Sequence, residues 1–235
     1  MRAQHRIRLE VLGPFRATDR AGGAVTPLGR HAQALLAVLA LAGVESVSRD
    51  RITALLWERR GEAQARHSLR QCLLGMRKAL DDHDAEILVA NPGAVRLASG
   101  TAEIDARTFE ELVTRGGSAS LRAAAELYRG DLLEGLFLQS EGFEEWLTAQ
   151  RSLWRGRMRD VLQRLAELEI DSGNSEGAVE ASRRLVALDS LHEPGHRVLM
   201  RAYALADRRA DALRQFAFAP KRSGANSIRS RTRIR

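Results

Sequence analysis

Short alternations of apolar and polar residues frame three helical stretches in the first hundred residues. Residues 7–13 alternate in this way and then meet Gly13-Pro14, which predicts a half-buried strand ended by a turn. Asn91-Pro92-Gly93 is also a turn sequence, and a short apolar run lies on each side of it. The strands predicted from these patterns cover residues 7–13, 25–28, 86–90 and 94–98.

The helical stretches between these strands have recognisable ends. The first runs from Arg30 to Ala42, is strongly apolar, and is stopped by Gly43. The second begins at Ser48, a good N-cap residue, and is expected to continue to Gly61. Its predicted buried stripe consists of Ile52, Leu55, Leu56 and Trp57.

The third helix is predicted from about Ala63 to Leu80. Its apolar stripe has helical spacings of four, three and four residues, and it consists of Leu69, Leu73, Met76 and Leu80. Several polar and cationic side chains lie off this stripe, namely Arg66, Arg70, Gln71, Arg77 and Lys78. At about 1.5 Å per residue, a helix of this length can cross a groove of duplex DNA.

Strands, three helices and then a hairpin are the layout of a winged helix-turn-helix. The major groove admits one helix, whose arginines reach guanine edges or phosphates, and the hairpin reaches the neighbouring phosphates or the minor groove. We therefore expect the five polar residues of the third helix to contact DNA. Arg49 and Arg51 could hold a phosphate at the start of the second helix, and Arg96 lies on the predicted wing.

Beyond Thr101 the pattern predicts only helices. Asp105 is the expected cap of a helix that ends near Thr114, and one long helix or two in series follow between Phe143 and Leu168. A shift of 34 residues then pairs Leu165 with Leu199, together with Ala166 and Met200, Gly173 and Asp207, and Ala178 and Ala212. This period is the length of a tetratricopeptide repeat, a helical hairpin that stacks on its neighbours.

Charge is spread unevenly along the 235 residues. Residues 1–100 carry 15 Lys and Arg against 10 Asp and Glu, residues 101–215 carry 16 against 20, and the final 20 residues carry six cations and no acid. Such asymmetry indicates an anionic partner, usually nucleic acid. With one cysteine, no signal-peptide pattern and no apolar run of bilayer length, we expect a cytoplasmic protein without membrane contact.

Several short segments together resemble the bacterial transcriptional activator domain family, the antibiotic-regulatory-type activators. They include Leu9-Glu-Val-Leu-Gly-Pro, Val47-Ser-Arg-Asp-Arg-Ile, Ser68-Leu-Arg-Gln, Tyr128-Arg-Gly-Asp-Leu-Leu and Phe143-Glu-Glu-Trp-Leu. The resemblance covers about residues 7–216 and implies an OmpR-type winged helix followed by a tetratricopeptide-like activator domain. It also implies promoter binding, often as dimers on direct repeats, with recruitment of RNA polymerase.

The expected protein is mainly α with small β content. We assign residues 1–100 to a winged helix-turn-helix that binds double-stranded DNA and residues 101–216 to the tetratricopeptide-like activator domain. Residues 217–235 are predicted to be a basic, disordered tail. The second repeat would then lack the helix that caps it, which would leave apolar surface on its outer face. Gly75 departs from the family, which often has a polar or basic residue there. The expected function is a sequence-specific transcription regulator, more specifically an activator.

Other interpretations of these features stay open. The helical repeats could form a protein-interaction scaffold beside a front domain that does not bind DNA, or the basic tail could drive DNA binding. One or two third-helix cations could instead pair with Glu62 or Asp81. His192 and His196 have metal-ligand spacing but lack an evident third ligand, and Cys72 fits a packed thiol. No catalytic motif is found, so we expect no enzyme activity, cofactor or metal.

Overall fold

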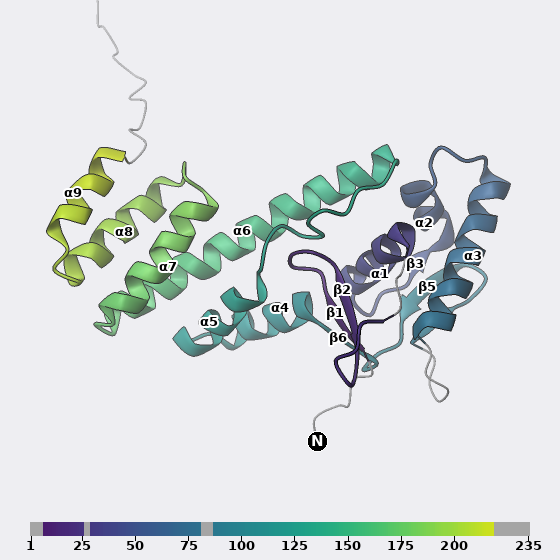
Figure 1. The fold of residues 1–235 in the computed structure, drawn as a ribbon, viewed down its shortest axis with the longest axis horizontal. Helices are drawn as coiled ribbons and strands as arrows, with labels where there is room; N and C mark the ends of the chain where they lie inside the picture. Colours follow the sequence, from purple (N-terminus) through teal and green to yellow (C-terminus); the bar gives the residue numbers. More distant parts are fainter. Residues whose placement is uncertain (1–6, 26–28, 81–86, 219–235) are drawn as a thin grey trace, which may run out of the picture. The chain divides into compact units, whose positions relative to one another are not determined.

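The computed structural model describes residues 7–25, 29–80 and 87–218, which form a mainly helical fold with two small sheets (Figure 1). The coarse fold class expected from the sequence is therefore confirmed. By contacts the chain divides into two compact units, residues 1–161 and 162–235. This division by contact does not test the domain limits 1–100, 101–216 and 217–235, which stay predictions.

The first sheet joins the beginning of the described chain to the residues that follow Thr101. Strand β1 (Ile7–Glu10) pairs antiparallel with β2 (Arg16–Asp19) and parallel with β6 (Ala102–Ile104). Ile7 and Leu9 are buried and Arg8 is exposed, as the alternation predicts. The expectation of helices alone beyond Thr101 is wrong, because the Ala102–Ile104 segment is held as a strand by its distant partner β1 rather than by a local pattern.

Three helices and a second sheet follow the first hairpin. Their bounds are α1 Arg30–Ala42, β3 Val47–Ser48, α2 Arg49–Leu56 and α3 Glu62–Leu80. The Ser48 hydroxyl accepts a hydrogen bond from the Arg51 N–H at 3.2 Å, which confirms the predicted N-cap. Helix α2 does not continue to Gly61 as expected. It ends at Leu56 because Trp57 leaves helical geometry and buries its side chain, 6% exposed, against the His31 ring.

The predicted hairpin is confirmed over its described residues. Strands β4 (Leu88–Ala90) and β5 (Ala94–Leu97) pair antiparallel, and β3 adds to β5, giving the order β3-β5-β4. The Asn91 side-chain oxygen accepts from the N–H groups of Gly93 and Ala94, which fixes the turn. The start of the predicted strand 86–90 lies outside the described residues, as do residues 26–28 of the strand predicted at 25–28; Val25 itself is in no strand.

The rest of the chain is helical. The first compact unit contains α4 Asp105–Arg115, α5 Ser118–Leu127 and the beginning of α6 Glu141–Asp171. The pattern between Phe143 and Leu168 is thus one continuous helix. The predicted cap role of Asp105 is wrong, because Ile104 is the N-cap and Asp105 is the first helical residue, with its carboxylate turned into the core.

The second unit holds α7 Ser175–Leu188, α8 Glu193–Leu205 and α9 Arg209–Phe218. Gly173 and Asp207, paired by the 34-residue shift, both adopt positive φ, of 76° and 54°, at the turns that precede α7 and α9. Helix α9 extends to Phe218, so the predicted disorder from residue 217 is wrong for its first two residues. The remaining predicted tail, 219–235, lies outside the described residues.

Candidate nucleic-acid interface

Helix α3 separates its residues into a buried seam and an outward face. The predicted stripe is confirmed, since Leu69, Leu73, Met76 and Leu80 are each at most 5% exposed. The helix packs through this seam against α1 and α2 of the same unit (Figure 1). At about 100° per residue, Gln71 and Lys78 point away from this seam, and both are exposed.

Arg70 and Lys78 are the least constrained cations of α3. Both side chains are exposed, and neither makes an ion pair or hydrogen bond with another residue in the described part of the chain. Gln71 is exposed between them. The structure therefore brings three of the five predicted third-helix residues onto one solvent-facing surface, which we call the outward face of α3.

The other two third-helix residues are placed differently. The Arg66 guanidinium lies 2.5 Å from the Glu62 carboxylate and 3.7 Å from that of Asp50. Arg66 therefore forms the ion pair with Glu62 that the sequence analysis gave as an alternative to DNA contact. Arg77 is half-buried at the edge of the seam. Asp81, the other acid considered as a partner, lies outside the described residues.

The second-helix and wing residues divide in a similar way. The Arg49 Nε donates to the Asn91 carbonyl at 2.8 Å, and its backbone N–H donates to Gly93, so Arg49 ties α2 to the hairpin turn. Arg51 is exposed one turn from the Ser48 cap. Arg96 is half-buried, and its Nη1 lies 3.4 Å from the Leu97 carbonyl.

Two features of α3 were not among the predicted contacts. Leu74 is 64% exposed although it is apolar, and a Cβ added at Gly75 would meet no atom within 4 Å. The predicted stripe assigned the core leucines correctly but gave no reason to examine Leu74. At about 100° per residue, Leu74 lies about 130° around the helix from the centre of this stripe, and an apolar residue at that angle is the signal that points to it.

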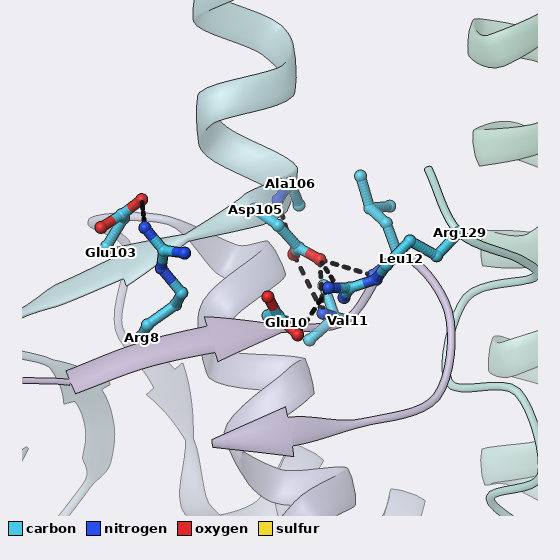
Figure 2. Close-up of polar contacts among 8 residues, drawn as sticks. All are labelled: Arg8, Glu10, Val11, Leu12, Glu103, Asp105, Ala106 and Arg129. Carbon is cyan, nitrogen blue, oxygen red and sulfur yellow. Dashed lines mark hydrogen bonds and ion pairs between the residues drawn. The ribbon is translucent and has the colours of Figure 1, made fainter. Parts of the chain in front are cut away.

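A polar cluster with a buried carboxylate lies where β1 ends and α4 begins (Figure 2). The Asp105 carboxylate accepts from the backbone N–H groups of Val11, Leu12 and Ala106 at 2.8–2.9 Å. Arg129 pairs with Glu10 at 2.5 Å and lies 3.5 Å from Asp105. Burial raises the pKa of the Asp105 carboxyl, while these N–H groups and Arg129 oppose that rise. This cluster, the Asp105 cluster, fixes α4 to the end of β1.

The histidine pair and the cysteine have structural partners. His192 bonds to the Gln163 side chain, and His196 bonds to the Ser190 carbonyl and the Gln215 side chain. In the described ranges no group of three or more His, Cys, Asp or Glu side chains is placed to hold a metal ion. Burial raises the pKa of the Cys72 thiol to about 11, in keeping with a packed thiol beside Met76.

No helix among the described residues is both long enough and apolar enough to cross a bilayer. The fold and the site together define a mainly helical protein with a basic, solvent-facing helix. The model of the family described as "Bacterial transcriptional activator domain" matches residues 96–223. The chain belongs to this bacterial transcriptional activator domain family, and the resemblance seen in its short motifs is confirmed.

Curated relatives agree with this assignment. The chain is 28% identical to the transcriptional regulatory protein MoaR1 of Mycobacterium tuberculosis, over 88% of this chain and 70% of MoaR1. It is 28% identical to the regulatory protein AfsR of Streptomyces coelicolor, over 90% of this chain and 22% of AfsR. The family and these names indicate transcriptional regulators and not enzymes, as the sequence predicts.

A solved structure extends the likeness to three dimensions. The structure of Mycobacterium tuberculosis EmbR in complex with a low-affinity phosphopeptide superposes with a TM-score of 0.71 at 26% identity. The superposition covers 90% of this chain and 58% of that EmbR chain. EmbR of the same organism is also among the curated relatives, as a transcriptional regulatory protein.

Proposed function

We propose that this protein is a sequence-specific DNA-binding regulator of transcription that inserts α3 into the major groove of promoter DNA. Residues 1–100 act as a winged helix-turn-helix with the β4–β5 hairpin as its wing. Residues 101–216 act as a tetratricopeptide-like activator domain, and residues 217–235 as a basic tail. Phosphate contacts supply most of the affinity, and α3 selects the site.

The outward face of α3 is the observation that carries this proposal. Several exposed or half-exposed arginines elsewhere in the first compact unit are paired with acids, as in Arg8 with Glu103, Arg155 with Asp131 and Arg157 with Glu110. Arg70 and Lys78 have no such partner in the described part of the chain. A polyanion is the partner that unpaired cations on a groove-sized helix complement best.

Cationic residues at the N-terminus of α2 and on the wing support these two places as phosphate contacts. Arg51 is exposed beside the capped N-terminus of α2, where free backbone N–H groups favour an anion. Arg49 holds the hairpin turn close to this end of α2, so its contribution is positioning together with charge. Arg96 extends from β5, and Arg66 and Arg77 flank the outward face of α3.

A gel-shift titration on duplexes selected from a random pool tests the DNA assignment. We expect Arg70→Ala to weaken specific binding by about tenfold or more, and Lys78→Ala to weaken all duplexes more evenly. Arg115→Ala removes the same charge from an exposed position on α4 and is expected to leave binding unchanged. Full-strength binding by the Arg70→Ala/Lys78→Ala double variant would contradict the assignment.

We further propose that the helical domain contacts RNA polymerase or a second copy of the chain on direct repeats. Support comes from large apolar side chains exposed on α8 and α9, namely Leu205, Leu213, Phe216 and Phe218. A Leu213→Ser/Phe216→Ser variant should bind one duplex site normally but lose transcription activation or dimerisation, measured by in vitro transcription and sedimentation. Unchanged activation and sedimentation would contradict this role.

The scaffold interpretation is tested by the same titration. A scaffold would form a stable protein complex through these exposed helices while showing no duplex binding at low salt. Duplex binding that depends on Arg70 would eliminate it. Binding that survives loss of the α3 cations but disappears when residues 219–235 are deleted would instead assign DNA binding to the basic tail.

A further inference from the structure

An apolar side chain lies at the centre of the proposed DNA-binding face. Leu74 is 64% exposed on α3, although the core-facing leucines of the same helix are buried. Residues three and four positions away are its neighbours on the helix surface. Those neighbours are Arg70, Gln71, Arg77 and Lys78, so Leu74 is enclosed by the polar side chains proposed to contact DNA.

No packing contact among the described residues requires a glycine at position 75, the next residue. Its backbone is helical, and a Cβ built there would meet nothing within 4 Å. Glycine is disfavoured relative to alanine in a helix interior, so this position carries a cost that no contact in the described part of the chain explains. Close approach of the helix backbone to a partner is a role that only a residue without a side chain can serve.

We propose that Leu74 and Gly75 form the specificity-determining patch of α3. The Leu74 side chain contacts the 5-methyl group of a thymine, and Gly75 lets the helix backbone approach the floor of the major groove. Thymine is the base that presents an apolar group in this groove, and the cations around Leu74 complement the phosphates on either side. This inference rests on the proposed function and names the chemistry that α3 would read.

Replacing thymine by uracil isolates the methyl group. A site is selected from a random duplex pool with the full chain, and each thymine of that site is then replaced in turn by deoxyuridine. At one position or more, we expect the wild type to lose about fourfold in affinity, the value of one buried methyl-sized group. Leu74→Ala should bind the thymine and uracil forms of that position equally.

Leu153→Ala provides the matched control, because Leu153 is a helical leucine that is 47% exposed on α6. It should keep the wild-type ratio of thymine to uracil affinity. Equal wild-type affinity at every substituted position, or an unchanged ratio in Leu74→Ala, would overturn the thymine contact. A chain that binds no duplex at low salt would overturn the proposed function itself, and it would show this before any thymine is replaced.

The role of Gly75 is tested by a substitution that should stabilise the fold but weaken DNA binding. Gly75→Ala adds a methyl group into open space on a helix, so we expect a higher melting temperature and weaker DNA binding. Gly156→Ala on α6 also adds a methyl group into open space and should raise the melting temperature without changing DNA affinity. Unchanged or tighter DNA binding by Gly75→Ala would overturn the close approach.

Discussion

The Asp105 cluster and the outward face of α3 use charge in opposite ways. Every group in the Asp105 cluster has its partner within the unit, since the carboxylate meets three backbone N–H groups and Arg129 bridges Glu10 and Asp105 (Figure 2). On α3, Arg70 and Lys78 face solvent without a partner in the described ranges. A buried charge with hydrogen-bond and ion-pair partners holds the elements around it in place. An exposed cation without an ion-pair partner is available to bind an anionic ligand.

This comparison separates residues that hold the fold from residues proposed to do the binding. Leaving a buried charge without its partner costs far more than removing an exposed charge that has none. Substitutions in the Asp105 cluster should therefore act on the free energy of unfolding. Substitutions on the outward face of α3 should act on DNA affinity and leave the fold unchanged.

The largest expected effect is that of Asp105→Ala. It leaves the buried N–H groups of Val11 and Leu12 without their acceptor and removes one of the two acid partners of Arg129. At about 1–3 kcal/mol for each unsatisfied N–H group, we expect a loss of about 2–5 kcal/mol in the free energy of unfolding. Urea denaturation measures this loss. Glu103→Ala, which breaks the exposed pair with Arg8, is the control and should cost less than about 1 kcal/mol. Equal losses would show that the cluster has no special role.

The next effect concerns the salt dependence of DNA binding. Each phosphate contact contributes about 0.9 to the slope of log K against log salt concentration. Removing Arg70 and Lys78 together should lower that slope by as much as about 1.8, while the free energy of unfolding changes by less than about 0.5 kcal/mol. If the double variant lost stability and kept the wild-type slope, Arg70 and Lys78 would be residues that stabilise the fold and not residues that contact phosphates.

A smaller effect is expected in acid. The hydrogen bond from Arg155 lowers the pKa of Asp131 below its ordinary value, so the stability from this pair is present above that ordinary value. It is lost as the pH falls through the lowered pKa of the folded state. The acid limb of a pH–stability curve should therefore flatten in Asp131→Asn, and an unchanged acid limb would contradict the pairing.

The smallest expected effect comes from releasing Arg66. Because Glu62 lies 2.5 Å from the Arg66 guanidinium, Glu62→Ala removes the nearer of its two acid partners, leaving Asp50 at 3.7 Å, and takes an acid from the edge of the proposed interface. We expect DNA affinity to rise by about two- to threefold at low salt, and less at high salt. Weaker binding in the gel shift would mean that the pair positions Arg66 for its contact.

Much of α3 could be predicted because its apolar face depends only on the spacing of residues close together in the sequence. The spacing of Leu69, Leu73, Met76 and Leu80 fixes which side of a helix is apolar, and all four are buried. The same holds for the hairpin around Asn91, whose side chain makes the turn bonds itself. Where the pattern and the contacts involve neighbours in the sequence, the expected elements agree with the structure.

Long-range contacts account for what could not be predicted. The β6 strand exists because it pairs with β1, and the Asp105 carboxylate bonds to Val11, 94 residues away. In the sequence, an acid at a helix start is the same whether it caps the helix or turns inward. Likewise, only the fold shows that Asp50 on α2 approaches Arg66, whereas Arg70 has no acid beside it in the described part of the chain.

Photocrosslinking from α3 tests the central claim most directly. A benzophenone side chain is introduced in place of Gln71 on the outward face, or in place of Arg115 on α4, and each full chain is irradiated with a selected duplex. We predict crosslinks from position 71 to bases within the selected site and none from position 115. A chain that binds the duplex tightly but crosslinks from position 115 and not from 71 would contradict the account.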